Sequence, residues 1–198
     1  MVKYMSKKSN KKGKYELTIS KFFGHLHNVN KHRFKVFYLC CRAGIPWRGF
    51  VHDLSKYSPT EFLESARYYV KGYSPIINCK KDKGYSEAWL HHKGRNKHHY
   101  EYWYDYTTSC EAPIIPFQYL VEMVCDTLAA GLTYQGKKWT KDYQLNYWFK
   151  TRENAKINPK IDFLLTKIYT EVSEQGIEKT INRKNLEYLY RKYIGKSR

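Results

Sequence analysis

Acidic residues are scarce in this sequence, and its cysteines follow no pattern. Asp and Glu number 18 against 36 Lys and Arg, which gives a net charge of +18. This imbalance favours polyanionic partners such as nucleotides, nucleic acid or an anionic surface. The five cysteines are odd in number and include no CxxC spacing, which argues against a disulfide framework and a cysteine zinc site. We expect buried thiols in a reducing compartment.

Long apolar runs are missing as well. No stretch approaches the roughly 18 residues that span a bilayer, and no signal-peptide core follows the basic start. The sequence therefore predicts a soluble cytoplasmic protein without a membrane partner. Residues 1–14 (MVKYMSKKSNKKGK) lack an apolar pattern and predict a flexible basic arm. Residues 15–198 are long enough to form one domain with its own core.

Helical periodicity runs through almost the whole chain, and no alternating strand pattern appears. The fold class we predict is therefore all-α. Residues 71–85 (KGYSPIINCKKDKGY) are rich in turn formers and predict a loop. Helices are expected over residues 16–43, 47–56, 59–70, 86–92, 98–104, 117–134, 141–152, 159–173 and 182–194.

Histidine and aspartate carry the chemical signal. Seven of the eight histidines stand out in chain order: His25, His32, His52, His91, His92, His98 and His99. Asp53 follows His52 directly, and Asp126 comes later. Neutral imidazole combined with carboxylate suits Fe, Mn, Ni or Zn better than it suits Ca or Mg.

Two of these residues are predicted to point inward. Asp126 lies in the segment 117–134, which is apolar on nearly all faces and therefore predicts a central helix. A buried carboxylate costs several kcal/mol unless it is paired or coordinates a cation. His32 shares a helical stripe with Val29 and Val36. Both side chains are therefore candidates for one buried site.

The motifs at these positions resemble a known superfamily. His32, the stretch VHDLSK at residues 51–56 and Asp126 together resemble the H…HD…D signature of the HD superfamily of helical metal-dependent phosphohydrolases. The resemblance implies a single-domain, HD-like helical bundle. It also implies that His32, His52, Asp53 and Asp126 bind a metal ion.

Members of that superfamily with two metals place two more histidines between the HD pair and the last Asp. This chain offers two adjacent pairs there and leaves the choice within each pair open. The first candidates are His92 and His99, with His91 and His98 as alternates. The spacing from His32 to His52 is shorter than is usual in the superfamily, so His25 is an alternate first ligand.

A narrower resemblance covers roughly residues 20–150. The stretches HDLSKYSPTEF, AWLHHKGRNKHHYEYW and VEMVCD are similar to an uncharacterised bacterial and phage family. Its members sometimes carry the automatic label catalase, but no haem-ligand pattern in the sequence supports that label.

Each candidate residue has an expected role. Asp53 is the natural bridge between two metals, because a carboxylate has two donor oxygens. Lys56 is expected to point its ammonium at a substrate phosphate, and Arg95 and Lys97 to add phosphate contacts. Glu122 is expected either to orient a ligand histidine or to act as general base. The catalytic candidates are thus Asp53, Lys56 and Glu122, and the substrate-binding candidates are Lys56, Arg95 and Lys97.

The function expected is hydrolysis of a nucleotide or related phosphate ester or anhydride by water activated on one or two divalent transition metal ions. Three alternatives remain open. An HD-type nuclease would track single-stranded nucleic acid with its basic arm and C-terminal helix. A di-iron HD oxygenase would consume oxygen. A non-enzymatic nucleic-acid-binding protein would keep its function without His52 and Asp53.

Overall fold

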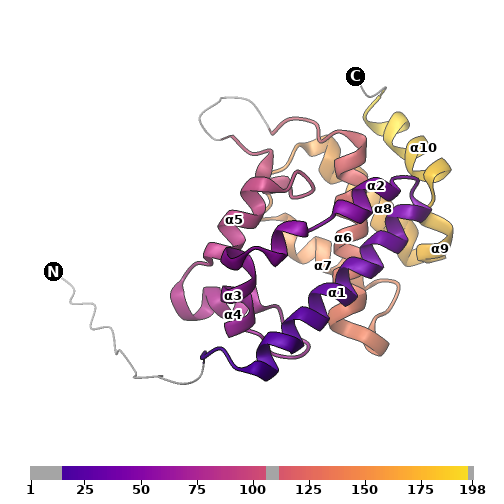
Figure 1. The fold of residues 1–198 in the computed structure, drawn as a ribbon. Helices are drawn as coiled ribbons and strands as arrows, with labels where there is room; N and C mark the ends of the chain where they lie inside the picture. Colours follow the sequence, from indigo (N-terminus) through magenta and orange to yellow (C-terminus); the bar gives the residue numbers. More distant parts are fainter. Residues whose placement is uncertain (1–14, 106–111, 196–198) are drawn as a thin grey trace.

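The computed structural model describes residues 15–105 and 112–195, and it is helical throughout (Figure 1). Within these ranges there are ten α-helices, three short 3-10 helices and no strand, so the all-α, single-domain prediction is confirmed. The basic arm predicted for residues 1–14 lies outside the described residues. The α-helices are α1 (Ile19–Arg42), α2 (Pro46–Val51), α3 (Pro59–Arg67), α4 (Pro75–Lys83), α5 (Glu87–Arg95), α6 (Phe117–Gln135), α7 (Tyr143–Arg152), α8 (Pro159–Gln175), α9 (Ile177–Thr180) and α10 (Arg183–Tyr193). The 3-10 helices are η1 (Leu54–Tyr57), η2 (Tyr100–Tyr102) and η3 (Gly136–Lys138).

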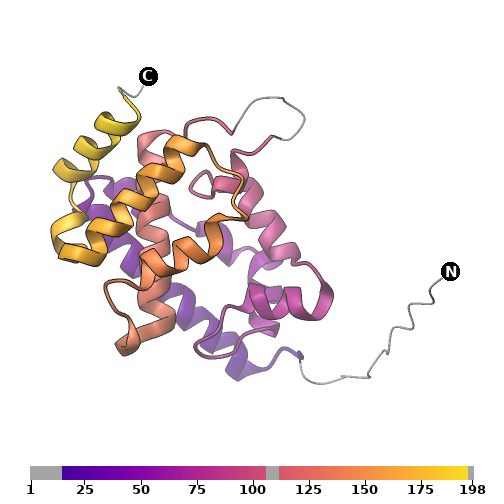
Figure 2. The same ribbon diagram turned by 180° about the vertical axis from the view of Figure 1, so that it is seen from behind.

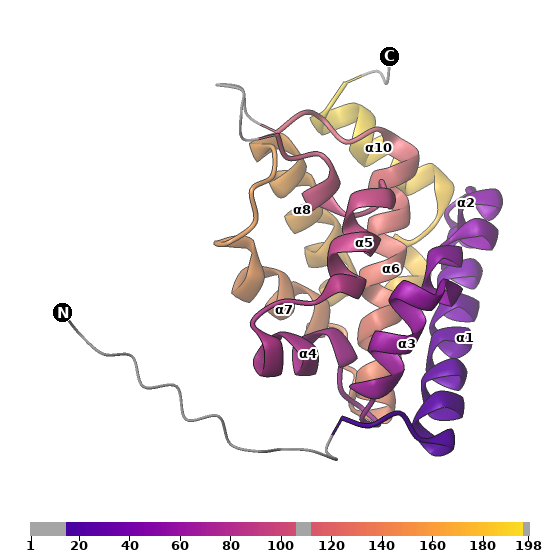
Figure 3. The same ribbon diagram turned by 60° about the vertical axis from the view of Figure 1, so that its left-hand side comes forward.

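Helix α6 lies at the centre of the bundle (Figure 3). It packs against α1 and α2 on one side and against α7 and α10 on another. Helix α3 connects α1 to α4 and α5, while α8 packs against α7, α9 and α10. Seen from behind, α7, α8 and α10 cover the face opposite α1 (Figure 2).

The two long helices that meet at the centre have the burial that their sequences predict. Helix α1 begins after Thr18, whose hydroxyl accepts a hydrogen bond from the Lys21 backbone N–H. Its buried stripe includes His25, Val29 and His32. Helix α6 is buried on nearly all sides, as expected of a central helix, and its buried residues include the charged Glu122 and Asp126. Helices α1 and α6 therefore both carry polar side chains into the apolar core.

Three local predictions are wrong. The expected loop at residues 71–85 contains helix α4, because Pro75 occupies its first turn and Gly84 (φ +85) ends it, so the turn formers mark helix ends. The helix expected over residues 98–104 is a single 3-10 turn. The helix expected over residues 47–56 ends at Val51, because the chain turns at Asp53.

The thiols and the helix lengths complete this comparison. Cys40, Cys79 and Cys125 are buried as expected, whereas Cys41 is exposed and Cys110 lies outside the described residues. No helix in the described part of the chain combines the length and apolarity needed to cross a bilayer.

Candidate metal centre

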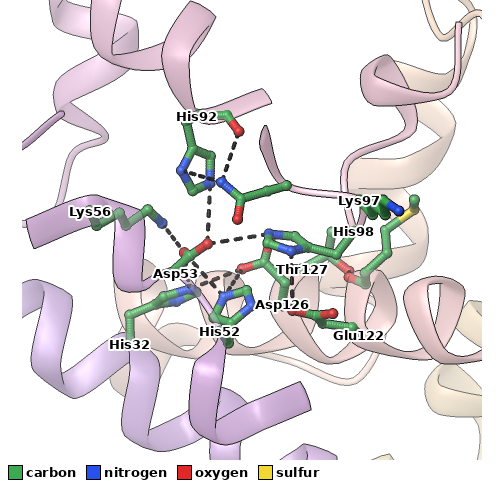
Figure 4. A network of polar contacts seen from close by, with 12 residues as sticks. His32, His52, Asp53, Lys56, His92, Lys97, His98, Glu122, Asp126 and Thr127 are labelled. Carbon is green, nitrogen blue, oxygen red and sulfur yellow. Dashed lines mark hydrogen bonds and ion pairs between the residues drawn. The ribbon is translucent and has the colours of Figure 1, made fainter. Parts of the chain in front are cut away.

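Side chains from five parts of the fold converge on Asp53 (Figure 4). His32 comes from α1, His52 and Asp53 from the turn after α2, and His92 from α5. His98 comes from the segment between α5 and η2, and Asp126 from α6. All six residues are buried.

The first group of potential ligands is His32, His52, Asp53 and Asp126. His32 Nε2 lies 2.9 Å from Asp126 Oδ1 and 3.8 Å from Asp53 Oδ2. His52 Nε2 lies 3.1 Å from Asp53 Oδ2 and 3.5 Å from Asp126 Oδ1. The structure therefore gathers the four residues of the H…HD…D signature around one point.

The second group consists of Asp53, His92, His98 and His99. Asp53 Oδ1 lies 3.2 Å from His92 Nε2 and 3.3 Å from His98 Nε2. Asp53 thus faces the first group with one carboxylate oxygen and the second group with the other. This is the arrangement that a bridging carboxylate requires.

The remaining ring nitrogens determine the state of these histidines. His52 donates from Nδ1 to Glu122 Oε1 over 3.0 Å, and His92 donates from Nδ1 to Glu61 Oε2 over 2.8 Å, while His98 Nδ1 lies 3.1 Å from Glu122 Oε1. A neutral imidazole that donates from Nδ1 presents a lone pair at Nε2. These three buried Nε2 atoms and both Asp53 oxygens have no hydrogen-bond partner.

Lone pairs that face carboxylate oxygens at such distances repel one another unless a cation lies between them. Metal–ligand bonds of about 2.1 Å place neighbouring ligand atoms about 2.9 to 3.4 Å apart. The separations of 2.9 to 3.8 Å in the first group are close to that range. These buried His/Asp groups could therefore hold a metal ion.

Neighbouring groups keep the carboxyl groups of Asp53 and Asp126 ionised. Burial alone raises the pKa of Asp53, but the positive charges of His52 and Lys56 hold that pKa well below its usual value. Burial likewise opposes ionisation of Asp126, yet the nearby imidazoles of His32 and His52 keep the pKa of Asp126 well below its usual range. Both groups are therefore carboxylates at neutral pH, the form that coordinates a cation.

The backbone at Asp53 is shaped for this site. Asp53 has φ 54 and ψ 27, and among the described residues it is the one non-glycine residue with positive φ. The left-handed region costs roughly 1–2 kcal/mol for such a residue, and strain of this kind often marks functional sites. Arg33 supports the turn by donating to His52 O over 2.8 Å and to Phe50 O over 2.9 Å.

The structure distinguishes the two roles expected for Glu122. Its Oε1 accepts from His52 and lies 3.1 Å from His98 Nδ1, and its Oε2 accepts from Arg48 Nε at 2.7 Å and from Arg48 Nη2 at 2.6 Å. Burial alone raises the pKa of Glu122, but the hydrogen bonds from His52 and His98 lower it to about 2. Both oxygens of Glu122 are thus engaged, which favours orientation of the histidines as its role. Glu122 also forms a third group of potential ligands with His52 and His98, which it contacts at Nδ1.

The three basic residues expected at the site differ in their contacts with the candidate ligands. Lys56 Nζ lies 2.5 Å from Asp53 Oδ2. Arg95 is exposed at the last residue of α5, and the Lys97 ammonium lies over the rings of Tyr102 and Tyr119, 5.8 and 5.5 Å from their centroids. The structure therefore places Lys56 against a candidate ligand, whereas neither Arg95 nor Lys97 forms an ion pair or a ring contact with any of the candidate ligands among the described residues.

The surroundings of the alternate histidines show which of them lie in the two groups of potential ligands. His25 is buried against Phe62 and belongs to neither group, so it does not replace His32. His91 donates from Nδ1 to Glu61 Oε1 over 2.7 Å and also lies outside both groups. His98, expected only as an alternate, is better oriented than His99 because Glu122 fixes its Nδ1. His99 remains a member of the second group.

Sequence reasoning missed two residues that support the site. Glu61 accepts hydrogen bonds from both His91 and His92, and Arg48 holds Glu122. Glu61 also follows Ser58 at the spacing of a capping box, and its backbone N–H donates to Ser58 Oγ over 3.4 Å. A helix cap was therefore a sufficient explanation for Glu61 in the sequence.

Comparison with known proteins gives one result. A protein-family model described as a family of unknown function (DUF5662) matches residues 21–171. Neither the curated proteins nor the solved structures include a match. The matched residues contain both groups of potential ligands. Because the match covers most of the chain, the protein belongs to this family of unknown function (DUF5662).

Proposed function

We propose that the protein is a metal-dependent phosphohydrolase of the HD type that acts on a nucleotide or a related phosphate ester or anhydride. The observation that carries the proposal is the position of Asp53, which faces one histidine-containing group with each carboxylate oxygen. The first ion would be held by His32, His52, Asp53 and Asp126, and a second by Asp53, His92 and His98 or His99. The mixture of imidazole and carboxylate favours Fe, Mn, Ni or Zn.

The chemistry of such a centre suits phosphoryl transfer to water. A divalent transition metal bound at these residues supplies hydroxide from water near neutral pH and neutralises charge on a phosphoryl oxygen. Asp53 and Asp126 are ionised, and the Nε2 lone pairs of His52 and His92 face the same region. The protein's net charge of +18 favours an anionic substrate.

Exposure indicates the direction from which the substrate approaches. The side chains of Lys56 and Asp126 are 32% and 13% exposed, whereas those of His52, Asp53 and His98 are fully buried. Lys56 therefore stands at the open side of the site. Its ammonium is placed to bind a phosphoryl oxygen once the charge of Asp53 is shared with a cation.

The test combines metal analysis with a hydrolysis screen. The purified protein is loaded with Mn²⁺, Fe²⁺, Ni²⁺ or Zn²⁺ and assayed against nucleotides, dinucleotides and cyclic oligonucleotides. We expect bound metal and product release from the wild type, and loss of both in Asp53→Asn. Asp142→Asn, which changes an exposed aspartate at the start of α7, should behave as the wild type.

Metal-loaded protein that releases no product from any of these compounds would contradict the proposal. Oxygen consumption by the iron-loaded protein would favour the oxygenase alternative instead. Degradation of single-stranded nucleic acid, with binding that weakens steeply as salt rises, would favour the nuclease. Unchanged nucleic-acid binding in the metal-free Asp53→Asn variant would favour the non-enzymatic protein.

A further inference from the structure

A single carboxylate oxygen lies behind both groups of potential ligands. Glu122 Oε1 accepts a hydrogen bond from His52 Nδ1 over 3.0 Å and lies 3.1 Å from His98 Nδ1 (Figure 4). His52 turns its Nε2 toward the first group, 3.1 Å from Asp53 Oδ2. His98 turns its Nε2 toward the second group, 3.3 Å from Asp53 Oδ1. Glu122 therefore orients one ligand of each group at the same time.

The position of Glu122 is itself fixed from the opposite side. Its side chain is 1% exposed, and a carboxylate this deeply buried needs compensating bonds. Arg48 provides them with two charged N–H groups that converge on the same oxygen, Oε2, and hold it in place. The guanidinium of Arg48 also lies over the Tyr119 ring, 4.8 Å from its centroid.

Glu61 has a similar place but only one connection to the ligands. It accepts from His92 Nδ1 over 2.8 Å, and its other oxygen accepts from His91, which belongs to neither group. Glu61 therefore supports the second group alone. Glu122 and Glu61 are thus two buried carboxylates of the same chemistry, but Glu122 contacts a ligand of each group and Glu61 contacts a ligand of one group.

We propose that Glu122, held by Arg48, is a positioning residue that makes the two metal sites depend on each other. This inference rests on the proposed function, because it assumes that the two groups bind ions. Loss of the Glu122 carboxylate frees the rings of His52 and His98 to rotate and to change tautomer, so the Nε2 lone pairs of both sites lose their direction. Partners that orient metal ligands typically account for about 10- to 100-fold in metal affinity.

The experiment compares metal binding by variants of the two carboxylates. Mn²⁺ and Co²⁺ are titrated into the full-length protein, with calorimetry for affinity and elemental analysis for stoichiometry. We expect the wild type to bind two ions. Glu61→Gln should weaken one ion about 10- to 100-fold and leave the other nearly unchanged, whereas Glu122→Gln should weaken both by such factors.

Three further variants separate position from charge and from folding. Glu122→Asp keeps the negative charge but withdraws the oxygen, so it should still weaken both ions if position is what matters. Glu64→Gln changes a buried carboxylate that contacts Ser86, Ala88 and Lys83 rather than a histidine, and it should leave both affinities unchanged. If Glu122→Gln fails to fold, Arg48→Met leaves the carboxylate in place and should still weaken both ions.

The outcomes distinguish this inference from the proposed function. A wild type that binds two ions, combined with a Glu122→Gln variant that loses only one or neither, overturns the inference and leaves the hydrolase proposal intact. A wild type that binds a single ion also overturns it. A wild type that binds no transition metal removes both proposals together.

Discussion

Arg33 illustrates how one side chain outside the ligand set can shape the centre. Its guanidinium donates to the carbonyls of Phe50 and His52, which lie on either side of Val51 at the end of α2, and to the hydroxyl of Tyr57 over 3.1 Å. These bonds hold the turn in which Asp53 takes its left-handed conformation. A lysine cannot replace this fork of donors, because its ammonium is a single point of charge.

We therefore predict that Arg33→Met destabilises the fold by about 1–3 kcal/mol, since it leaves backbone carbonyls without their donor. The same change should weaken metal binding at the His52–Asp53 turn. Urea denaturation and metal titration measure the two effects. Arg33→Lys should recover little of either loss, and Lys31→Met, on the exposed side of α1, should match the wild type.

Single residues also mark the limit of what the sequence could reveal. His32, His52, Asp53 and Asp126 were identifiable because their order follows a known signature and because Asp126 interrupts an apolar helix. Glu61, Arg48 and Arg33 could not be identified from the sequence. They act through contacts with residues that are distant in the sequence, and no periodic pattern marks them. The choice of His98 over His99 likewise depends on Glu122, which lies on another helix.

At the scale of elements, the approach of α2 to α1 sets the position of the HD pair. Gly49 makes this approach close: a Cβ at this position would lie 2.6 Å from Cys40 Cβ and 3.0 Å from Phe37 Cα. The second of these neighbours is backbone and cannot move aside cheaply. Any side chain on Gly49 therefore pushes α2, and the His52–Asp53 turn that follows it, away from α1.

We predict that Gly49→Ala costs about 1–3 kcal/mol of stability, the range typical of overpacking, and reduces metal affinity. Gly94→Ala is the matched control, because Gly94 lies within α5 with open space around its Cα. There the substitution should be neutral or stabilising by up to about 1 kcal/mol. Equal behaviour of the two variants in thermal melts and metal titrations would contradict this account of Gly49.

Helices α3 and α5 are joined by a buried carboxylate that gives stability a dependence on pH. Glu64 accepts from Ser86 Oγ over 2.6 Å, from the Ala88 N–H over 3.0 Å and from Lys83 Nζ over 3.3 Å. Burial alone raises its pKa, but these hydrogen bonds hold the pKa of Glu64 below its ordinary value. The unfolded chain should have the ordinary Glu pKa of about 4.3.

Because the folded pKa is the lower one, this contribution to stability is complete above about pH 4.3 and is lost as pH falls through the folded pKa. We predict that Glu64→Gln flattens this part of the acid limb. Urea midpoints measured between about pH 3 and 6 should converge for the variant and the wild type at the acid end. A constant difference across that range would show that Glu64 is not protonated there.

Helices were predicted correctly where the apolar periodicity extends over several turns. They were missed where Pro or Gly could mark either a loop or the end of a helix. The cores of α1, α6 and α8 were identifiable because their apolar residues repeat over several turns. Helix α4 was missed because Pro75 and Gly84 stand at its ends, where turn formers serve a helix as well as a loop. The segment after Asn96 was misread because the Asn96 amide donates to His92 O over 2.8 Å and ends α5.

For the whole molecule, the site joins parts of the chain that are far apart in the sequence. Its potential ligands come from α1, the turn after α2, α5, the segment that follows α5, and α6. An ion bound there stabilises the folded state but not the unfolded chain. Metal binding and global stability are therefore linked by mass action.

We predict that removal of metal with a chelator lowers the thermal midpoint. Free metal at about 1,000 times its dissociation constant contributes about 4 kcal/mol, which corresponds to roughly 8–16 °C for a chain of this size. Calorimetry with and without added Mn²⁺ measures the shift. Asp53→Asn should abolish it, whereas a shift of the same size in that variant would place the ion elsewhere.

The wide separation of His32 and Asp126 along the chain also bears on the order of folding. The first group is complete only when α1, the turn after α2 and α6 have docked, and the second only when that turn has met α5 and the segment after it. We therefore expect that an ion bound there would slow unfolding without accelerating refolding. The metal-free polypeptide would then reach its native topology without the ion. An ion that binds afterwards would act by lowering the rate of unfolding.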